Sequence, residues 1–313
     1  MQLLFDIVIP VFILMVLGWG CSRWGLLEES SASALNRYVY YIAVPALMFT
    51  STATVDIQAV LQWDFIGVYI GGSLIAILMA FLAWRKMQLG KPLDWTVIAL
   101  NAAWANTVYM GVPIFYFMFG DRGALPVIIA TLASNLVFIL VLALMSELQN
   151  SEGGILSKLK TLLLQALLKN PVMMAPLLGM VVSISGVSLP AMILTPLQML
   201  APSAAPVALF ALGISLSGLS VRKGSFELTW LTLVKLVLHP LATFGLGLWV
   251  GLEPFWLASA VVLAALPTGA MVYVLAQQYN TRVTLTSATI MVTTLVSMVT
   301  LAVLLPLMKQ WGG

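Results

Sequence analysis

Apolar stretches of about 20 residues, separated by short polar breaks, make up most of this 313-residue chain. A helix of that length matches the hydrocarbon core of a bilayer, which is about 30 Å thick. Because 61% of the residues are hydrophobic and only 8% are charged, a soluble fold of this size could not bury the apolar surface. The sequence therefore predicts an all-α integral membrane protein with ten transmembrane helices. The spans are expected near residues 5–22, 35–53, 65–84, 95–118, 124–146, 171–187, 197–219, 228–250, 255–279 and 285–308.

The basic residues are distributed unevenly between the two sides of these spans. They are concentrated in the odd-numbered loops, whereas the even-numbered loops and both tails carry only Arg122 and Lys309. By the positive-inside rule, both termini are expected outside the cytoplasm of a cell (inner) membrane protein. The first apolar run follows no basic residue and precedes no small-residue cleavage site, so it is expected to remain as a helix.

The two halves of the chain share landmarks at an offset of 161 residues. Pro10 corresponds to Pro171, Gly25 to Gly186, and AVPALMF (43–49) to AAPVALF (204–210). The predicted unit is five spans, and because five is odd, the second copy must cross the membrane in the opposite sense. We therefore expect a 5+5 inverted repeat, with residues 1–147, a cytoplasmic linker at 148–169, and residues 170–313. Secondary transporters often have this architecture, with a binding site at mid-membrane.

Each half interrupts its fourth span near the middle with residues that disfavour a helix. The first interruption is NTVYMGVP (106–113) and the second is LPTGAMVY (266–273). A single such motif usually gives only a kink, but a matched pair at equal depth favours a site. Broken helices 4 and 9 that cross there would bring half-helix N-termini together, and such termini suit an anion.

Several segments resemble the auxin efflux carrier family in order along nearly the whole chain. They are LNRYVYYIAVPALMF (35–49), NTVYMGVP, NPVMMAPLLG (170–179), the Lys235 and Pro240 pair, and ALPTGAMVYVLAQQY (265–279). The resemblance implies an elevator-type transporter of a small organic anion, such as malonate, malate or an auxin-like aromatic acid. It implies scaffold helices at 1–53 and 170–219, which usually form a homodimer in the lipid bilayer. The mobile transport domain would hold helices 64–147 and 228–308, crossing at Pro113 and Pro267.

The same resemblance assigns the substrate site. Asn106 and Asn135 match a pair of amides that contacts the substrate carboxylate, and a neutral amide can both bind and release an anion. Relatives often have asparagine where this chain has Met271, which either favours a substrate with an apolar portion or is a neutral packing change. The expected substrate-binding residues are Asn106, Thr107, Tyr109, Gly111, Pro113, Asn135, Pro267, Thr268, Gly269 and Met271.

Lys235 and His239 lie one helical turn apart inside the eighth span. Two interpretations of Lys235 fit the sequence: it snorkels to the cytoplasmic surface, or it is a counter-charge or a proton carrier. His239 is the only histidine and is either a hydrogen-bonded interior group or part of proton coupling. No predicted span has an acidic residue near its centre, which argues against a carboxylate-based ion site.

Other function classes fit the sequence less well. GISLSG (213–218) lacks the spacing of a nucleophile elbow, so we expect no enzyme. We also expect no cofactor, no metal site and no nucleic-acid partner. An anion channel is the stronger alternative, since irregular backbone at mid-membrane also builds selectivity filters. A Na⁺-coupled organic-anion symporter of the bile-acid type would need cation ligands, for which Asn101, Asn106 and loose carbonyls are candidates.

Overall fold

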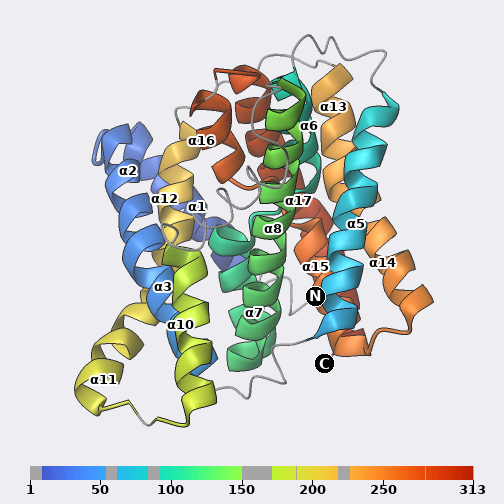
Figure 1. Ribbon diagram of the computed structural model, residues 1–313. Helices are drawn as coiled ribbons and strands as arrows, with labels where there is room; N and C mark the ends of the chain where they lie inside the picture. The colour runs from blue at the N-terminus through green and yellow to red at the C-terminus, as the bar shows by residue number, and fades with distance from the viewer. Residues whose placement is uncertain are drawn as a thin grey trace. The chain divides into compact units, whose positions relative to one another are not determined.

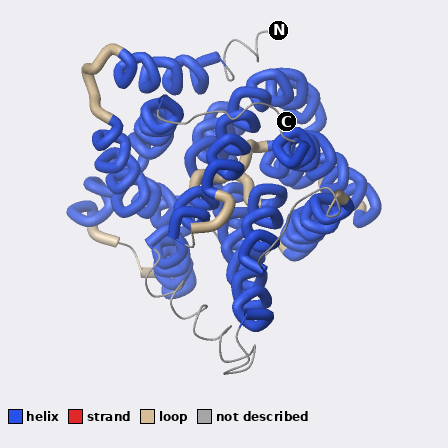
Figure 2. Tube along the Cα trace, turned by 90° about the horizontal axis from the view of Figure 1, so that it is seen from above, coloured by secondary structure: helices blue, strands red, loops and turns tan. Residues whose placement is uncertain are grey.

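A computed structural model describes residues 9–53, 62–83, 92–149, 171–187, 189–217, 226–278 and 280–312. Within these ranges the chain consists of helices joined by loops, and no strand is drawn in Figure 2. The expectation of an all-helical chain is confirmed for the described residues. The predicted linker at 148–169 falls almost entirely outside them.

The helices follow the predicted apolar stretches (Figure 1). The first half contains α1 (Ile9–Arg23), α2 (Glu29–Tyr38), η2 (Val39–Ala43), α3 (Val44–Ala53), α5 (Trp63–Leu82), α6 (Pro92–Ala103), η4 (Thr107–Gly111), α7 (Val112–Phe119), η5 (Gly120–Gly123) and α8 (Ala124–Gln149). The second half contains α10 (Pro171–Ser185), α11 (Ala191–Leu200), η6 (Ala201–Ser203), α12 (Ala204–Ser217), α13 (Phe226–Leu233), η7 (Val234–Leu238), α14 (His239–Val250), α15 (Pro254–Ala265), α16 (Met271–Gln278) and α17 (Val283–Gly312).

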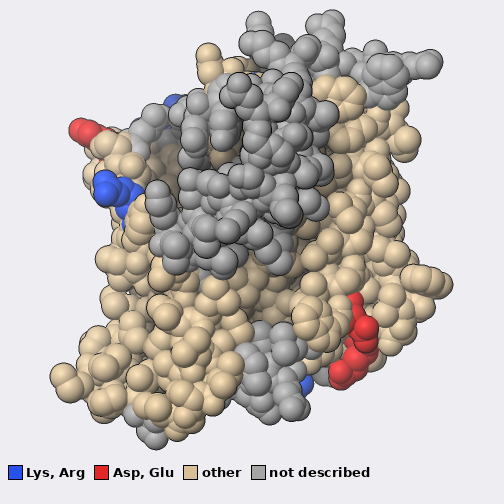
Figure 3. Space-filling view, in the orientation of Figure 1, with Lys and Arg blue, Asp and Glu red and all other residues tan. Residues whose placement is uncertain are grey.

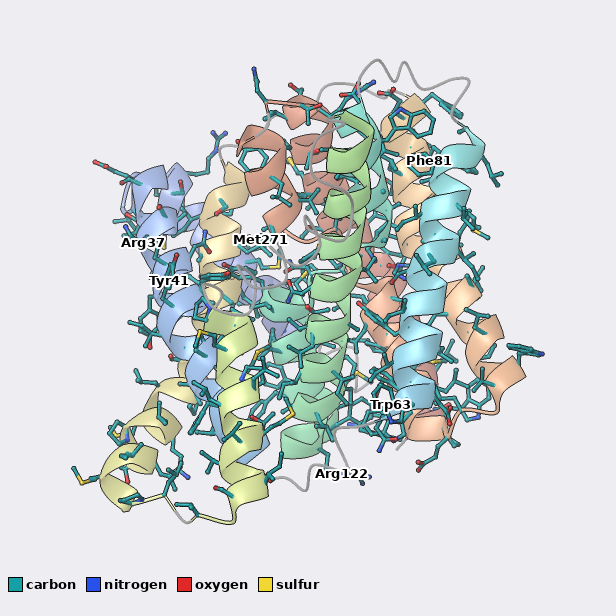
Figure 4. All side chains as sticks on the ribbon, viewed as in Figure 1. Arg37, Tyr41, Trp63, Phe81, Arg122 and Met271 are labelled. Atoms are coloured by element: carbon teal, nitrogen blue, oxygen red, sulfur yellow. The ribbon has the colours of Figure 1, made fainter. Side chains whose placement is uncertain are left out.

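Four helical segments are long and apolar enough to cross a membrane: Trp63–Leu82, Ala191–Ser215, Phe226–Val250 and Val283–Gly312. Shorter apolar helices accompany them. Few charged side chains are visible among the described residues on the face in Figure 3. On α5, Trp63 and Phe81 lie near opposite ends (Figure 4), and tryptophan is common where a span meets the membrane interface. These features fit a multi-pass membrane protein, while the ten-span 5+5 arrangement remains a prediction.

Three wide π turns stand directly before prolines. The π segments η2, η4 and η7 end at Ala43, Gly111 and Leu238, each two residues before a proline. A proline has no N–H, and its ring clashes with the carbonyl four residues earlier in an α-helix. A π turn shifts the hydrogen-bonding register by one residue, so the helix continues past the proline. These prolines therefore widen their helices without ending them.

The described chain forms two compact units, and the first comprises Met1–Gln62, Val108–Ile129 and Leu164–Gly218. In this unit α1 packs on α12 and α3 packs on α10. A side chain at Gly18 would meet the carbonyl of Phe210, and one at Gly179 would meet the carbonyl of Phe49. Adding 161 to 18 gives 179, and adding 161 to 49 gives 210. The two helix pairs therefore make the same close contact at the offset of the sequence landmarks.

The turns after α1 and α10 repeat at the same offset. Gly25 and Gly186 both adopt left-handed backbone, with φ of 71° and 64°. The N–H of Gly25 donates to the main-chain carbonyl of Ser22 at 3.1 Å, and that of Gly186 donates to the main-chain carbonyl of Ser183 at 3.2 Å. Only glycine adopts this conformation at little cost, which explains why it recurs at both positions.

The close contact at Gly179 predicts a loss of stability in Gly179→Ala. The added methyl group would meet the Phe49 carbonyl and the Thr52 hydroxyl, so α3 and α10 must move apart. Such overpacking should lower the free energy of unfolding by about 1–3 kcal/mol. Gly67→Ala in α5 is the matched control, because nothing lies within 4 Å of its added methyl group. Unfolding temperatures in detergent measure both effects, and equal stability of the two variants would contradict the prediction.

The second unit comprises Trp63–Thr107, Ala130–Leu163 and Leu219–Gly313. Here α15 packs against α14, α17 and α5, and its residues from Trp256 to Ala265 are all buried. A helix that is apolar all round belongs at the centre of its unit. The predicted scaffold helices (1–53 and 170–219) and transport-domain helices (64–147 and 228–308) are defined by motion, so that division remains a prediction.

Candidate functional site

The first interrupted span leaves the helix at Trp104–Asn106. Helix α6 ends at Ala103, and helical structure resumes with η4 at Thr107. The sequence predicted the interruption within 106–113, with Pro113 at the crossing, but Pro113 lies in the first turn of α7, after a π turn. The widened turn accommodates Pro113, because it removes the clash that would otherwise break the helix.

The second interruption lies at Leu266–Ala270. Helix α15 ends at Ala265 and α16 begins at Met271, so Pro267, Thr268 and Gly269 fall between them. Here Pro267 does stand in the break, as the sequence predicted.

The two interruptions pair with each other through main-chain hydrogen bonds. Ala105 and Thr268 form an antiparallel bridge. On either side of it, the N–H of Asn106 donates to the carbonyl of Pro267 at 2.9 Å, and the N–H of Gly269 donates to the carbonyl of Trp104 at 3.0 Å. Backbone that leaves a helix at membrane depth must be satisfied within the protein, and each break satisfies the other.

Close approach explains the glycine in this bridge. A side chain on Gly269 would meet the indole of Trp104, so any other residue would push the two breaks apart. We call this structure, Trp104–Thr107 paired with Leu266–Ala270, the crossover.

Side chains stabilise the carbonyls where α6 ends. The Thr268 hydroxyl donates to the carbonyl of Asn101 at 2.8 Å, and the N–H of Thr268 donates to the hydroxyl of Thr293 at 3.2 Å. Asn101 donates through Nδ2 to the hydroxyl of Thr286 at 3.0 Å. Its Oδ1 is buried without a hydrogen-bond partner among the described residues. A buried acceptor of this kind suits a water, a donor or a cation.

Lys235 stabilises the C-terminal end of α15, which leads into the second interruption as the end of α6 leads into the first. Its side chain is fully buried, and Nζ donates to the carbonyl of Ala264 at 2.7 Å. Because the C-terminal end of a helix carries partial negative charge, an ammonium group is favourable there. The snorkelling interpretation is therefore wrong, since Lys235 points into the unit and caps a half-helix beside the crossover.

His239 continues this polar contact. Its Nδ1 lies 3.1 Å from Lys235 Nζ, and its Nε2 lies 3.4 Å from the Ser73 hydroxyl. An ammonium group can only donate, so with Lys235 charged, Nδ1 accepts and the imidazole proton lies on Nε2. Lys235 and His239 thus join α15, η7 and α5 in one hydrogen-bonded network.

A threonine that the sequence did not single out links Thr107, the residue after Asn106, with the helix that carries Asn135. The Thr131 hydroxyl donates to the Thr107 hydroxyl at 2.9 Å, and Asn135 Nδ2 donates to the Thr131 carbonyl at 2.9 Å. Asn106 is 3% exposed and Asn135 is 8% exposed, so both amides are withdrawn from solvent. Thr131 precedes Asn135 by four residues on α8, a spacing that places two residues on one helix face.

The remaining predicted residues are placed as follows. Met271 is the first residue of α16 and is 39% exposed (Figure 4). Tyr109, Gly111 and Pro113 belong to the other compact unit. The described part of the chain contains no group of three or more His, Cys, Asp or Glu that could hold a metal ion.

The crossover can hold a carboxylate by neutral donors. An amide N–H₂ group has two donors, and in Asn135 one of them is given to the carbonyl of Thr131. Hydroxyls can add further donors, because they rotate to suit a partner. A site built from neutral donors would place no permanent charge against an anion, and such an arrangement suits release as well as binding.

Comparisons with known proteins agree with these features. The family described as "Membrane transport protein" matches residues 3–305. The chain is 28% identical over 308 residues to a protein of Rhizobium meliloti named "Putative malonate transporter", covering 97% of this chain and 95% of that protein. It is 28% identical over 299 residues to an uncharacterized transporter of Methanothermobacter thermautotrophicus, covering 95% of each. Auxin efflux carrier component 2 of Arabidopsis thaliana is 31% identical over 141 residues, which cover 44% of this chain and 21% of that protein.

Proposed function

Because the chain belongs to the membrane transport protein family that includes the auxin efflux carriers, we propose that it is a secondary-type transporter of a small organic anion. The observation that carries this proposal is the crossover, where two interrupted spans pair through their main chains. Discontinuous helices at a repeat interface are where secondary transporters place their binding sites. The substrate class is a mono- or dicarboxylate, such as malonate, malate or an auxin-like aromatic acid.

The carboxylate is held by the amides of Asn106 and Asn135 beside the crossover. The linkage from Thr107 through Thr131 to Asn135 supports this assignment, since it holds the two amide-bearing elements in register. Lys235 places a buried amino group one hydrogen bond from α15, and in its protonated form the charge would act over a longer range in the low-dielectric interior than in water. Transport occurs by alternating access, as an elevator motion of the helices that carry the crossover.

The repeated contacts in the first unit support the inverted repeat on which this mechanism depends. The Gly18 and Gly179 contacts, and the turns at Gly25 and Gly186, recur at one offset. The ten spans then place both termini outside the cytoplasm of a cell inner membrane. The protein forms a homodimer through its scaffold helices. Helix α11 supports this, since none of its side chains is buried and both Met192 and Met199 are largely exposed.

A thermal-shift screen of the purified protein tests the substrate class. We expect a carboxylate at 100 times its dissociation constant to raise the free energy of unfolding by about 2.7 kcal/mol. The screen compares mono- and dicarboxylates with matched amides, which keep the shape but lack the charge. Counterflow of the stabilising acid into preloaded proteoliposomes then tests transport. Stabilisation by no carboxylate would overturn the proposal.

Two alternatives give different results in the same experiments. A channel would conduct ion currents in reconstituted bilayers and would show no counterflow. A Na⁺-coupled symporter is favoured by one observation, the buried Oδ1 of Asn101 without a hydrogen-bond partner among the described residues. In that case the thermal shift caused by the anion would increase with Na⁺, and Asn101→Leu would abolish the increase.

A further inference from the structure

A cluster of charged and polar side chains joins the starts of three helices in the second unit. Arg282 Nη1 donates to both carboxylate oxygens of Glu227 at 3.1 and 3.3 Å, and Arg282 Nη2 donates to Asp94 at 3.4 Å. The Thr281 hydroxyl donates to the other Asp94 oxygen at 2.6 Å. Asp94 and Glu227 stand in the first turns of α6 and α13, and Arg282 directly precedes α17.

The cluster is partly withdrawn from water, which strengthens its interactions. The side chains of Arg282, Asp94 and Glu227 are 14–18% exposed, and Thr281 is buried. Fully exposed ion pairs contribute little to stability, whereas a shared, partly buried arginine loses less of its interaction to solvent screening. A guanidinium group is also suited to this place because its planar donors can serve two carboxylates at once.

The backbone at this cluster adopts a conformation that side chains disfavour. Asn280 and Arg282 have φ of 47° and 49°, and neither is glycine. Asparagine adopts left-handed backbone readily, but an arginine does so only at a cost in free energy. Such a conformation persists only where surrounding contacts hold it. The contacts that hold this turn include those of Thr281 and Arg282 with Asp94.

Asp94 connects the cluster to the crossover, because it lies at the opposite end of α6. Helix α6 begins beside Asp94 and ends at the crossover, while α16 begins at the crossover and ends just before the turn at 280–282. The two half-helices pack against each other. They are joined at one end by the bridge between Ala105 and Thr268, and at the other by Asp94 with Thr281 and Arg282.

We infer that Asp94, Thr281 and Arg282 form a clamp that keeps α6 and α16 together as one rigid pair throughout transport. This inference rests on the proposed function, since the pair carries one side of the anion site. Arg282 and Asp94 are then positioning residues, which set the spacing of the half-helices without contacting the anion. The competing possibility is a gate, in which the same two helix ends separate in each cycle to admit the anion.

A disulfide in place of the polar contact distinguishes a clamp from a gate. The double variant Asp94→Cys with Thr281→Cys is made in a Cys21→Ser background, because Cys21 is the only native cysteine. If the ends stay adjacent, the disulfide forms readily in membranes without any anion. We expect the oxidised protein to keep anion affinity and counterflow within about twofold of the Cys21→Ser parent. An oxidised protein that binds the anion but shows no counterflow would overturn the clamp in favour of a gate.

Opening the clamp gives the complementary test. Asp94→Ala should weaken anion binding about tenfold, because the half-helices no longer hold one spacing, and Asp94→Asn should recover most of the affinity by keeping an acceptor for Thr281. Unchanged affinity in Asp94→Ala would overturn the inference. If Asp94→Ala does not fold, the reduced and oxidised forms of the double cysteine variant give the same comparison. Failure of the proposed function is distinguishable, since the parent protein would then bind no carboxylate while the disulfide yield still reports on the helix ends.

Discussion

Lys235→Met should lower the rate of anion counterflow by at least about tenfold and should also lower the unfolding temperature. Methionine fills a similar volume but cannot donate, so the Ala264 carbonyl and His239 Nδ1 lose their buried partner. A buried polar group without a partner costs about 1–3 kcal/mol. Losing the positive charge beside the C-terminal end of α15 adds up to about 2 kcal/mol. Destabilising this helix end should also slow transport, because residues 266–270 follow it directly and form half of the crossover.

Two control variants test whether the effect depends on where the lysine lies and on the shape of the charged group. Lys309→Met makes the same chemical change in the last turn of α17 and should leave counterflow and stability nearly unchanged. Lys235→Arg keeps the charge, but its planar group is larger and the native side chain is fully buried, so activity should not recover. Near-native counterflow in Lys235→Met would show that the cap is dispensable. If Lys235→Met lowers the stability but leaves anion affinity unchanged, Lys235 contributes to folding and not to anion binding.

The interruptions could be predicted from sequence because their cause is local. Asparagine, glycine and proline within an apolar run each weaken a helix through their own backbone or side chain. Both interrupted spans were found in this way, and Pro267 stands in its break. Pro113 does not, since the π turn at Thr107–Gly111 accommodates it and the helix breaks at Trp104–Asn106. A proline pattern locates an interrupted span better than it locates the break.

The partners of the buried polar groups could not be predicted, because they come from distant parts of the chain. Lys235 caps a carbonyl 29 residues away, and Thr281 meets a carboxylate 187 residues away. In the sequence, Arg282 is one of the basic residues in the odd-numbered loops, where arginine is expected to set the topology. Its left-handed backbone and its two carboxylate partners become visible only in the folded chain. Resemblance to a family placed Asn106 and Asn135, but it gave no indication of Thr131.

Asn106→Ala should weaken binding of the transported carboxylate about ten- to a hundredfold. A hydrogen bond to a charged group contributes about 1.5–3 kcal/mol, and each 1.4 kcal/mol is a factor of ten in the dissociation constant. The substitution should leave the crossover intact, because Asn106 joins it through its main-chain N–H, which alanine keeps. The unfolding temperature without the anion should therefore change little, while the shift caused by the anion should shrink.

Asn106→Asp makes the prediction sharper. Aspartate has nearly the same shape, but it replaces the donor with a negative charge that repels the anion at a buried position. Binding should fall further than in Asn106→Ala, although less volume is lost. Asn36→Ala is the matched control, since Asn36 lies in α2 and donates to Ser215, and both residues belong to the first unit, whereas the crossover belongs to the second. If both Asn106 variants bind the carboxylate as the native protein does, the anion site does not lie at the crossover. An order in which aspartate binds better than alanine would instead mean that Asn106 faces a cation, and the Na⁺-coupled alternative would then be preferred.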